Sequence, residues 1–595
     1  DQYGSDRWLI FIAFVMGLSI GVHLLNLLAI PAIAMVVYFK RASEINKKGI
    51  LAAFLLGLLV LAAILWGVIQ WLVGFASKVD LLFVNSLGLG FGSGIIFLCL
   101  LVGCAMVYGL FYSYRKRWYT LNTVLLAFCF ILFGYSSYTM VLIRGKANPS
   151  LNNNAPDNVF SFLGYLGREQ YTREPLVKGP YDVSKAVDEE SKPSYRKEKS
   201  GYTAFTQVEN YKFDRETFFP RVYSQDANHQ AYYRSYLKLK DGEMPQFSDN
   251  FKFFFHFQLG EMYARYFLWN FAGRQNDKQG YGTYNDGNWL SGLKTLDNWR
   301  LGGQYNLSES QQNDPSRNTY FFLPLLLGIA GVIWLYRNNK PYTLVLTLLF
   351  VFTGIAIVVY LNQTPLQPRE RDYAYAGSFY TFAIWIGLGT IAVVRFLKRF
   401  FHTRYALATG ISFALLGGPI ILIYQNWDDH NRSEKSLARD VARNYLETCA
   451  PNAILFTYGD HDTFPLWYLQ EVEGVRPDVR IVVLSYLTGD WYMQQAKKPT
   501  YRAAGLPIAI PAEKTKKGIR DYIPFVDRQL NESVDIQQLL QFVTSDHPDY
   551  KIQLNSGNLE NYFPTKKVRL AIDRAEVLKK NAVPAYFQDA VVSTM

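Results

Sequence analysis

The sequence predicts an α-helical polytopic membrane protein of about eight spans, with an extracytoplasmic insertion and a C-terminal α/β soluble domain. Three observations carry this prediction: apolar runs of span length, long polar regions between and after them, and a strand–helix–strand pattern in the tail. Half of the 595 residues are hydrophobic and 16% are aromatic, but the apolar residues are concentrated in runs. Such concentration is typical of membrane helices.

The apolar runs contain enough residues for transmembrane helices, because a helix rises about 1.5 Å per residue and about 20 residues cross the hydrocarbon core. The first run is too long for one straight span and contains His23, Asn26 and Pro31, so we expect a kinked or broken helix there. Residues 1–142 and 319–424 are each predicted to hold four spans. The runs are 8–39, 50–73, 93–114, 118–142, 319–336, 342–361, 379–396 and 405–424.

The short loops between the runs fall into two groups that differ in charge. The first group holds 13 Lys or Arg and one acid, whereas the second holds three basic residues and three acids. Because basic loops stay in the cytoplasm, the first group is predicted to face the cytoplasm. The membrane is predicted to be the cytoplasmic (inner) membrane. The beginning of the chain and both large polar regions are then predicted on the outer, periplasmic side. The first group comprises 40–49, 115–117, 337–340 and 395–404, and the second 74–92 and 362–378.

The net charge of +12 is explained largely by this topology signal. No nucleic-acid recognition motif accompanies it, so the composition gives no support for a nucleic-acid partner.

The polar region 143–318 is too long for a simple loop and is predicted to be an extracytoplasmic insertion. Asn158–Tyr171 has the pattern of a short helix with an apolar face. Phe251–Phe271 is apolar and aromatic but is interrupted by charged side chains, including Glu261 and Arg265. An amphipathic helix lying in the membrane interface fits this pattern, and a core helix of an outer domain fits it equally.

The tail 425–595 is predicted to be an extracytoplasmic α/β domain. Ala453–Thr457 and Arg480–Ser485 are typical of buried strands, with helical segments at 434–448 and 464–473. A parallel strand–helix–strand unit is therefore expected, and ligands of such sheets gather at the carboxyl ends of the strands.

Asp460, His461 and Asp462 directly follow the first of these strands. Their oxygen and nitrogen atoms suit a divalent metal, but three adjacent residues rarely all face one ion. A turn in which Asp462 caps the next helix is therefore favoured, and the sequence establishes neither a metal nor another cofactor. The glycine-rich stretch Gly88–Gly94 follows no strand and is interpreted as a flexible outer loop.

Arg369, Glu370, Arg371 and Asp372 stand in a row between two predicted spans. Charges at a membrane edge are costly, so such clusters are usually paired or functional. Two guanidinium groups are suited to bidentate phosphate binding. The two acids can hold these guanidiniums, bind a metal or accept the proton of a hydroxyl. Salt bridges that only pin the loop to the helices are the alternative.

Four further residues are weaker candidates for the same site. Tyr373 and Tyr375 can stack on a sugar or line the membrane interface. His23 can contact a phosphate or carry a proton, and a packing histidine is the equal alternative. Arg144 can contact a phosphate, although a side chain that snorkels to the membrane surface is favoured.

Four stretches of the chain resemble a large family of bacterial multipass membrane proteins long described as a domain of unknown function. That family is related to the eukaryotic transmembrane protein O-mannosyltransferases and is placed in the GT-C glycosyltransferase superfamily. The resemblance covers nearly the whole chain. The stretches are RWLIFIAFVMGLSIGVHLLNLLAIPAI from Arg7, QLGEMYARYFLWNFAGRQND from Gln258, QPRERDYAYAGSFY from Gln367 and GDHDTFPLWYLQEVEG from Gly459.

The resemblance implies a transferase that moves a sugar from a polyprenyl-phosphate donor to a hydroxyl acceptor, Ser or Thr of an exported protein. It also implies a catalytic carboxylate in an Asp-x-Gly-Glu-Phe type motif that should precede Asp1. The chain is therefore interpreted as a fragment without its N-terminal part, inactive alone, with Glu370 or Asp372 as the fallback base. His461 departs from the family's Gly-Asp-x-Asp pattern, where Asn is expected, and this weakens a metal role.

Two other function classes stay open at this point. A transporter or flippase of lipid-linked sugars would use the same charges, but its two halves should then be structurally equivalent, and no such symmetry is visible. A non-catalytic scaffold for envelope assembly is the third interpretation. Failure of the full-length protein to bind a polyprenyl-phosphate sugar would favour that one.

Overall fold

The computed structural model describes residues 6–169, 174–240, 242–280, 283–304, 307–508, 510–519, 523–553, 559–580, 583 and 588. The chain divides into two compact units. Unit 1 holds residues 1–147 and 156–435, and unit 2 holds residues 148–155 and 436–595.

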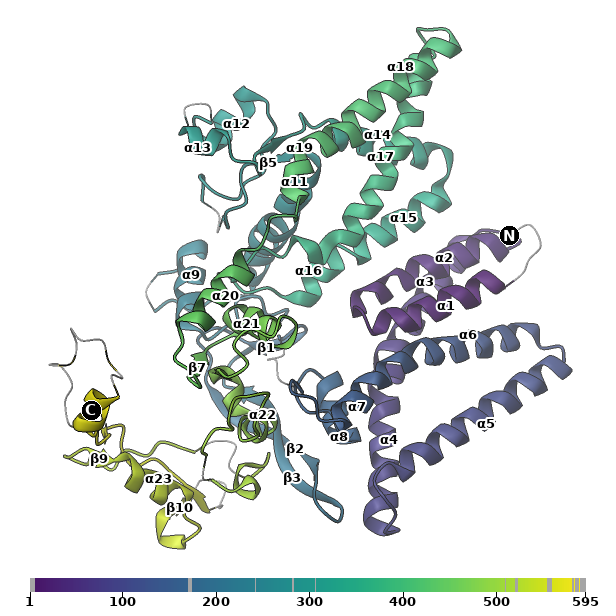
Figure 1. Cartoon of the computed structure of the whole chain (residues 1–595). Helices are drawn as coiled ribbons and strands as arrows, with labels where there is room; N and C mark the ends of the chain where they lie inside the picture. The colour runs from purple at the N-terminus through teal and green to yellow at the C-terminus, as the bar shows by residue number, and fades with distance from the viewer. Residues whose placement is uncertain are drawn as a thin grey trace. The chain divides into compact units, whose positions relative to one another are not determined.

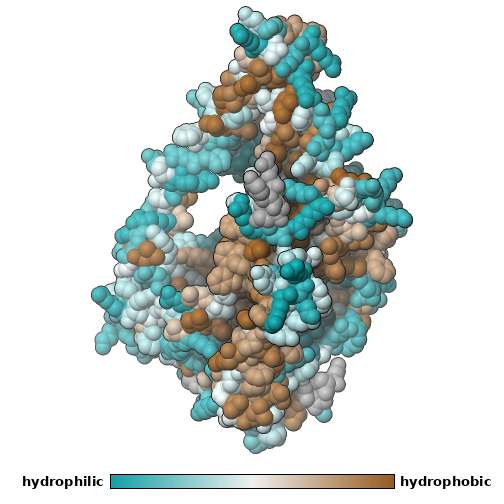
Figure 2. Space-filling view, turned by 90° about the vertical axis from the view of Figure 1, so that its right-hand side faces the viewer, coloured by the Kyte–Doolittle hydropathy of each residue, from teal (hydrophilic) through white to brown (hydrophobic). Residues whose placement is uncertain are grey.

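Within the described residues, seven helices are long and apolar enough to cross a membrane, and two shorter apolar helices accompany them. The protein is therefore a polytopic helical membrane protein, as predicted, with nine apolar helices where the sequence showed eight runs (Figure 1). Figure 2 shows broad apolar surface, in brown, on the side that carries the N-terminal helices. The long helices are Leu24–Arg41, Lys47–Ser86, Ser93–Arg115, Tyr119–Lys146, Lys340–Leu361, Asp372–Leu397 and Thr403–His430, and the short ones Arg7–Ile20 and Leu323–Asn338.

The first apolar run consists of two helices rather than one broken span. α1 (Arg7–Ile20) is followed by a 3₁₀ turn, η1 (Leu24–Ala29), and by α2 (Ile30–Arg41). His23 caps the turn by accepting a backbone N–H at 3.2 Å. Pro31 lies in the first turn of α2, where its missing N–H is not needed, so it begins a helix instead of kinking one.

An ion pair shows that α1 and α2 run antiparallel. Arg41 at the end of α2 pairs with Asp6, which immediately precedes α1. The beginning of the chain therefore lies on the same side as the basic loop 40–49, and the prediction that it lies on the opposite side is wrong. The unbroken apolar run hid the turn, because the residues of η1 are themselves apolar.

The helix Lys47–Ser86 extends far beyond the predicted run 50–73 and carries a buried acid near its end. Asp80 is fully buried and accepts hydrogen bonds from the N–H groups of Gly92 and Gly94, at 3.2 and 3.0 Å, and from the hydroxyl of Tyr202, at 2.8 Å. The glycine-rich stretch is thus held by a carboxylate, and its interpretation as a flexible loop is wrong. The segments of the helix are α3 (Lys47–Ala62), η2 (Ala63–Trp71), α4 (Leu72–Leu81) and η3 (Leu82–Ser86).

The insertion contains short strands and helices outside the apolar set. α8 begins after Asn158, whose side chain caps it as the predicted short helix requires, and ends at Leu166; residues 170 and 171 of that prediction lie outside the described residues. β2 and β3 form a long antiparallel hairpin, and β1 pairs antiparallel with β4. The elements are α8 (Val159–Leu166), β1 (Lys178–Pro180), β2 (Ala186–Lys197), β3 (Tyr202–Phe213), β4 (Glu216–Phe218) and α9 (Ala227–Leu237).

The aromatic segment predicted at 251–271 is a continuous helix made of α10 (Phe247–Lys252), η5 (Phe253–Ala264) and α11 (Arg265–Phe271). Much of it is buried in a core that also includes residues of α9 and α16. This burial favours the core-helix interpretation over a helix that only lies in the membrane interface. Phe251 and Phe255 on its other side are exposed. The buried members include Phe253, Phe254, Phe257, Met262, Tyr263, Tyr266 and Trp269.

The second set of apolar helices packs closely where glycines face backbone. A Cβ on Gly331 of α14 would lie 1.8 Å from the carbonyl oxygen of Trp385 on α17, so only glycine permits this contact. The elements from 273 to 430 are β5 (Gly273–Arg274), α12 (Lys294–Leu301), α13 (Glu309–Gln312), β6 (Asn318–Thr319), α14 (Leu323–Asn338), α15 (Lys340–Phe352), α16 (Ile355–Leu361), η6 (Asp372–Tyr375), α17 (Ala376–Leu397), α18 (Thr403–Leu415), η7 (Leu416–Ile420) and α19 (Ile421–His430).

Unit 2 contains the strand–helix–strand unit that the sequence predicts. β7 (Ile454–Thr457) and β8 (Arg480–Val483) are parallel, with Ile454 paired with Arg480. α20 (Leu437–Thr448) precedes them and α21 (Asp460–Glu471) joins them, and a buried core lies between these helices and the strands. The remaining helices and strands are η8 (Leu484–Thr488), α22 (Asp490–Ala496), η9 (Ala512–Thr515), β9 (Val534–Asp535), α23 (Ile536–Thr544), η10 (Pro548–Tyr550), β10 (Lys551–Gln553), β11 (Leu559–Asn561), β12 (Val568–Arg569) and α24 (Arg574–Lys579).

Candidate functional site

The charged loop lies between α16 and η6, and Asn362 sets its direction. Asn362 ends α16 in the left-handed region, at φ 41°. Its fully buried side chain donates to the carbonyls of Pro175 and Pro220, at 2.7 and 2.9 Å, and accepts from Gln258 at 3.0 Å. The loop is therefore tied to the insertion and to the core helix before its charges begin.

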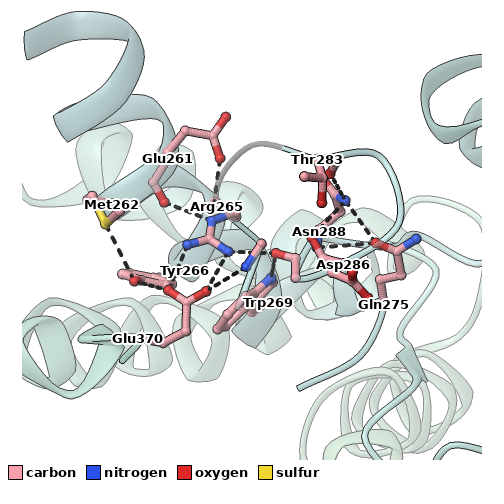
Figure 3. Close-up of polar contacts among 12 residues, drawn as sticks. Glu261, Met262, Arg265, Tyr266, Trp269, Gln275, Thr283, Asp286, Asn288 and Glu370 are labelled. Carbon is pink, nitrogen blue, oxygen red and sulfur yellow. Dashed lines mark hydrogen bonds and ion pairs between the residues drawn. The ribbon is translucent and has the colours of Figure 1, made fainter. Parts of the chain in front are cut away.

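Glu370 forms a bidentate ion pair with Arg265 of α11, with N–O distances of 3.0 and 2.8 Å. The side chains of Glu370 and Arg265 are 12% and 7% exposed. The Tyr266 hydroxyl also donates to Glu370, and the N–H of Gly280 lies 3.3 Å from it (Figure 3). Since both carboxylate oxygens are occupied, Glu370 anchors the loop to the core helix.

Arg265 is held on all sides. It donates to the carbonyl oxygen of Gly287 at 2.7 Å and to that of Glu261 at 2.9 Å, and its guanidinium lies 4.8 Å from the ring centre of Trp269. Figure 3 shows Glu261 and Glu370 on different sides of Arg265. Burial raises the pKa of Glu261, and the nearby charge of Arg265 opposes the rise. Glu261 is therefore a second carboxylate at this site, with one oxygen 3.5 Å from Arg265.

Glu370 has an ion-pair partner, whereas Arg369 and Arg371 on either side of it have none among the described residues. The Arg371 backbone N–H donates to the Tyr266 hydroxyl at 3.2 Å, while its side-chain Nε is buried without a partner among the described residues. Desolvation raises the pKa of Glu174, and a hydrogen bond with Tyr223 and the charge of Arg371 oppose this rise. Arg369 is exposed and lies 5.4 Å from the ring centre of Tyr373.

Asp372 and the two loop tyrosines begin the next helix. Asp372 is the first residue of η6 and is half-buried. Tyr373 is 53% exposed, whereas Tyr375 is fully buried, with its ring centre 5.2 Å from that of Tyr263. Of the two tyrosines predicted to contact a sugar or acceptor, Tyr373 is the accessible one, and Tyr375 is part of the core.

A layer of buried amides and one more arginine lies beside the loop. Gln258 donates to the carbonyl oxygen of Gln363 at 2.9 Å, yet both side-chain polar atoms of Gln363 and the Oε1 of Gln258 have no partner among the described residues. Arg221 is fully buried, stacks 3.9 Å from the ring centre of Phe219 and donates to the carbonyl oxygen of Val359 at 3.0 Å. Its Nε and Nη2 are likewise unpartnered. Buried groups of this kind are rare unless water or a ligand satisfies them.

The structure does not bring all predicted residues to this site. In the described part of the chain, no hydrogen bond or ion pair joins His23 or Arg144 to the loop residues 369–372. Leu25 and Leu28, close to His23 in sequence, do pack against the aromatic core beneath the loop.

The turn of unit 2 behaves as the favoured interpretation predicts. Asp462, the third residue of α21, accepts the N–H groups of Tyr458 and of the N-cap residue Gly459, both at 2.9 Å, and so closes the start of the helix as a capping box. Asp460 accepts from the Tyr486 hydroxyl at 2.9 Å, and His461 is exposed. The described residues contain no group of three or more His, Cys, Asp or Glu suited to a metal ion.

Sequence reasoning missed Arg265, Tyr266 and Arg221 as members of this site. Arg265 and Glu261 stand four positions apart in an otherwise aromatic segment, a spacing that places them on one helix face. That spacing was the available signal. The partnership of Arg265 with Glu370 spans 105 positions and leaves no local pattern.

The fold and site together define a polytopic membrane protein that presents a charged, partly buried loop at the ends of its apolar helices and carries a separate α/β unit. The family described as "Protein O-mannosyl-transferase TMEM260 N-terminal domain" matches residues 1–46, and "TMEM260-associated domain 2" matches residues 438–595. Residues 172–255 match a family of unknown function (DUF8416). The chain is thus related to the eukaryotic protein O-mannosyl-transferases.

A curated relative supports this relationship over a limited length. The mouse (Mus musculus) protein O-mannosyl-transferase TMEM260 is 30% identical over 115 residues, which is 19% of this chain and 16% of the mouse protein. No solved structure matches the chain.

Proposed function

We propose that this protein is a glycosyltransferase that moves a sugar from a polyprenyl-phosphate donor to a hydroxyl acceptor, Ser or Thr of an exported protein. The relationship to proteins described as protein O-mannosyl-transferase supports transfer to protein hydroxyls, and it makes mannose the first sugar to test. The long apolar helices suit a donor that is anchored in lipid. The proposed location is the cytoplasmic membrane, with the loop on its outer face.

The charge balance of the loop carries the proposal. Glu370 is neutralised by Arg265, which comes from another element, and not by its neighbours in the loop. Among the described residues, Arg369 and Arg371 form no ion pair with a carboxylate. The two guanidiniums, with the Asp372 carboxylate beside them in the loop and Glu174 within electrostatic reach of Arg371, are thus without a direct ion pair in the described part of the chain. Arginine forks of this kind bind phosphate groups bidentately.

In the proposed reaction, the acceptor oxygen forms a bond to the anomeric carbon of the sugar while the bond from that carbon to the phosphate oxygen breaks. The electron pair of the broken bond goes to the phosphate, whose growing charge Arg369 and Arg371 stabilise. Asp372 is the carboxylate of the loop that we assign to take the hydroxyl proton, and Tyr373 is placed to contact the sugar. Glu370 positions the loop.

The test uses the full-length protein in liposomes, with a radiolabelled polyprenyl-phosphate mannose and a Ser/Thr-rich acceptor peptide. Arg371→Ala should lower transfer about 100-fold, in the range seen when a group that stabilises the leaving charge is removed. Arg371→Lys should retain part of the activity, because an ammonium keeps the charge but loses the bidentate fork.

The matched control is Arg337→Ala, an exposed arginine at the end of α14 in the basic loop 337–340. It should leave transfer unchanged. Undiminished transfer by a normally expressed Arg371→Ala variant would contradict the phosphate role. Donor binding without transfer to any hydroxyl acceptor would instead favour the transporter or flippase interpretation, and failure to bind the donor would favour the scaffold interpretation.

A further inference from the structure

Residues 148–155, here called the strap, belong to unit 2 although the chain on both sides of them belongs to unit 1. The strap is irregular, with a bend at Ser150 and a turn at 153–154, and contains the sequence Asn148-Pro149-Ser150-Leu151. Asn148 contacts unit 2 through its side-chain oxygen, which accepts from Lys498 at 3.2 Å. A separate segment of the chain thus lies on unit 2 in the way that a bound peptide would.

Ser150 is the centre of this contact. Its hydroxyl donates to the Glu471 carboxylate, at 3.0 and 3.2 Å from the two oxygens, and lies 3.0 Å from the Tyr501 hydroxyl. Tyr501 also donates to Glu471. The carbonyl oxygen of Ser150 accepts from the Gln495 side chain. One serine is therefore held by its hydroxyl and by its main chain at once.

The strap leaves part of this site open. A pocket of about 40 Å³ remains beside Ser150 and Leu151, room for a few water molecules or a small side chain. Trp467 and Tyr492 give it aromatic walls. Arg480 also lines it, 8% exposed, with its guanidinium bound to a threonine hydroxyl and to main-chain carbonyls.

We infer that unit 2 binds peptide segments through a Ser or Thr hydroxyl, and that the strap fills this site as an internal stand-in for such a peptide. The link of that hydroxyl to glycosylation rests on the proposed function. Gln495 donates to a main-chain carbonyl oxygen, a group that every peptide has. The Glu471 carboxylate and the Tyr501 hydroxyl both contact the Ser150 hydroxyl, so a short hydroxyl side chain, Ser or Thr, fits this position. Glu471 and Tyr501 are exposed, so solvent and an incoming peptide can reach these hydrogen bonds and the strap can exchange.

The test measures binding of a fluorescently labelled decapeptide with the sequence of residues 147–156, ANPSLNNNAP, to the full chain in detergent by anisotropy. In one variant, residues 148–151 are replaced by glycine, which keeps the chain length and empties the site. This variant should bind the peptide at least about tenfold more tightly than the unmodified chain, because the strap no longer competes. The same peptide with Ala in place of Ser should bind about tenfold more weakly, the effect of losing one hydrogen bond to a charged group.

Ser150→Ala is the second variant, chosen because it changes one small side chain and should fold normally. It should also bind the peptide more tightly than the unmodified chain, and adding Glu471→Gln should remove the preference for the Ser peptide. Equal binding of the Ser and Ala peptides, or no binding by either strap variant, would overturn the inference. Peptide binding that persists while sugar transfer fails would support this site and contradict the proposed function; normal transfer without peptide binding would do the reverse.

Discussion

Loop 362–375 of unit 1 and the turn 458–462 of unit 2 both carry acidic residues between two regular elements, but they satisfy the charges differently. In the loop, Glu370 is 12% exposed and is neutralised by an arginine from another helix. In the turn, Asp462 is exposed and accepts two backbone N–H groups of its own segment. Acidic residues in similar sequence settings can therefore be satisfied in two ways. A buried carboxylate needs a distant counter-ion to offset its desolvation, whereas an exposed one needs only backbone N–H groups of its own segment.

The largest expected effect tests the network. Arg265→Ala leaves Glu370 buried and unpaired, so we expect a loss of about 3–5 kcal/mol in the free energy of unfolding of unit 1. The double variant Arg265→Met/Glu370→Leu removes both charges and should recover much of that loss. Thermal unfolding in detergent, followed by tryptophan fluorescence, measures both. Lys192→Ala, which breaks an exposed ion pair with Glu209, is the control and should change little. If Arg265→Ala were as stable as this control, the contrast between buried and exposed charge would fail.

A second prediction concerns a buried acid that has no counter-ion in contact. Asp182 is 1% exposed, its carboxylate oxygens have no partner among the described residues, and burial raises its pKa to about 6, with the charge of Arg234 opposing the rise. Because the folded-state pKa exceeds the unfolded one, the protonated form stabilises the fold at low pH, and that stability is lost as pH rises from about 4 through about 6. The loss should be about 3 kcal/mol.

Asp182→Asn should flatten this pH dependence, since an amide does not titrate. The measurement compares the unfolding midpoint at pH 5 and pH 7.5 for the unmodified chain and the variant. If the unfolding midpoint of the variant changed with pH as much as that of the unmodified chain, Asp182 would be hydrated in the folded protein. It would then resemble the exposed Asp462 rather than the buried Glu370.

The smallest effect belongs to the turn. Asp462→Ala removes a helix cap and should destabilise unit 2 by about 1 kcal/mol, as such caps usually do. His461→Ala, at the neighbouring exposed position, should have no effect on unfolding. A destabilisation by Asp462→Ala as large as that of Arg265→Ala would mean that the turn is more than a cap, and a bound ion would then be sought there.

The sequence was informative where a signal is local. β7 and β8 were predicted because short apolar strands flanked a helix. A cap at Asp462 was predicted because the helical pattern was expected from 464; α21 begins at Asp460, so Asp462 acts from its first turn. The charged loop was recognised because charges are costly near a membrane. The partner of Glu370 was not predictable, because Arg265 lies 105 positions away. The turn between α1 and α2 was hidden because its residues are as apolar as the helices that it joins.

The helix Lys47–Ser86 has a length of about 60 Å, because its 40 residues rise about 1.5 Å each. The hydrocarbon core of a bilayer is only about 30 Å thick, so the helix is about twice as long as a perpendicular span requires. Near its end, Asn85 exchanges hydrogen bonds with the backbone of Tyr202, at 2.7 and 2.8 Å, where the hairpin strand β3 begins. The length of this helix therefore sets how far the start of β3 lies from Lys47, and removing two helical turns would shorten that distance by about 10 Å.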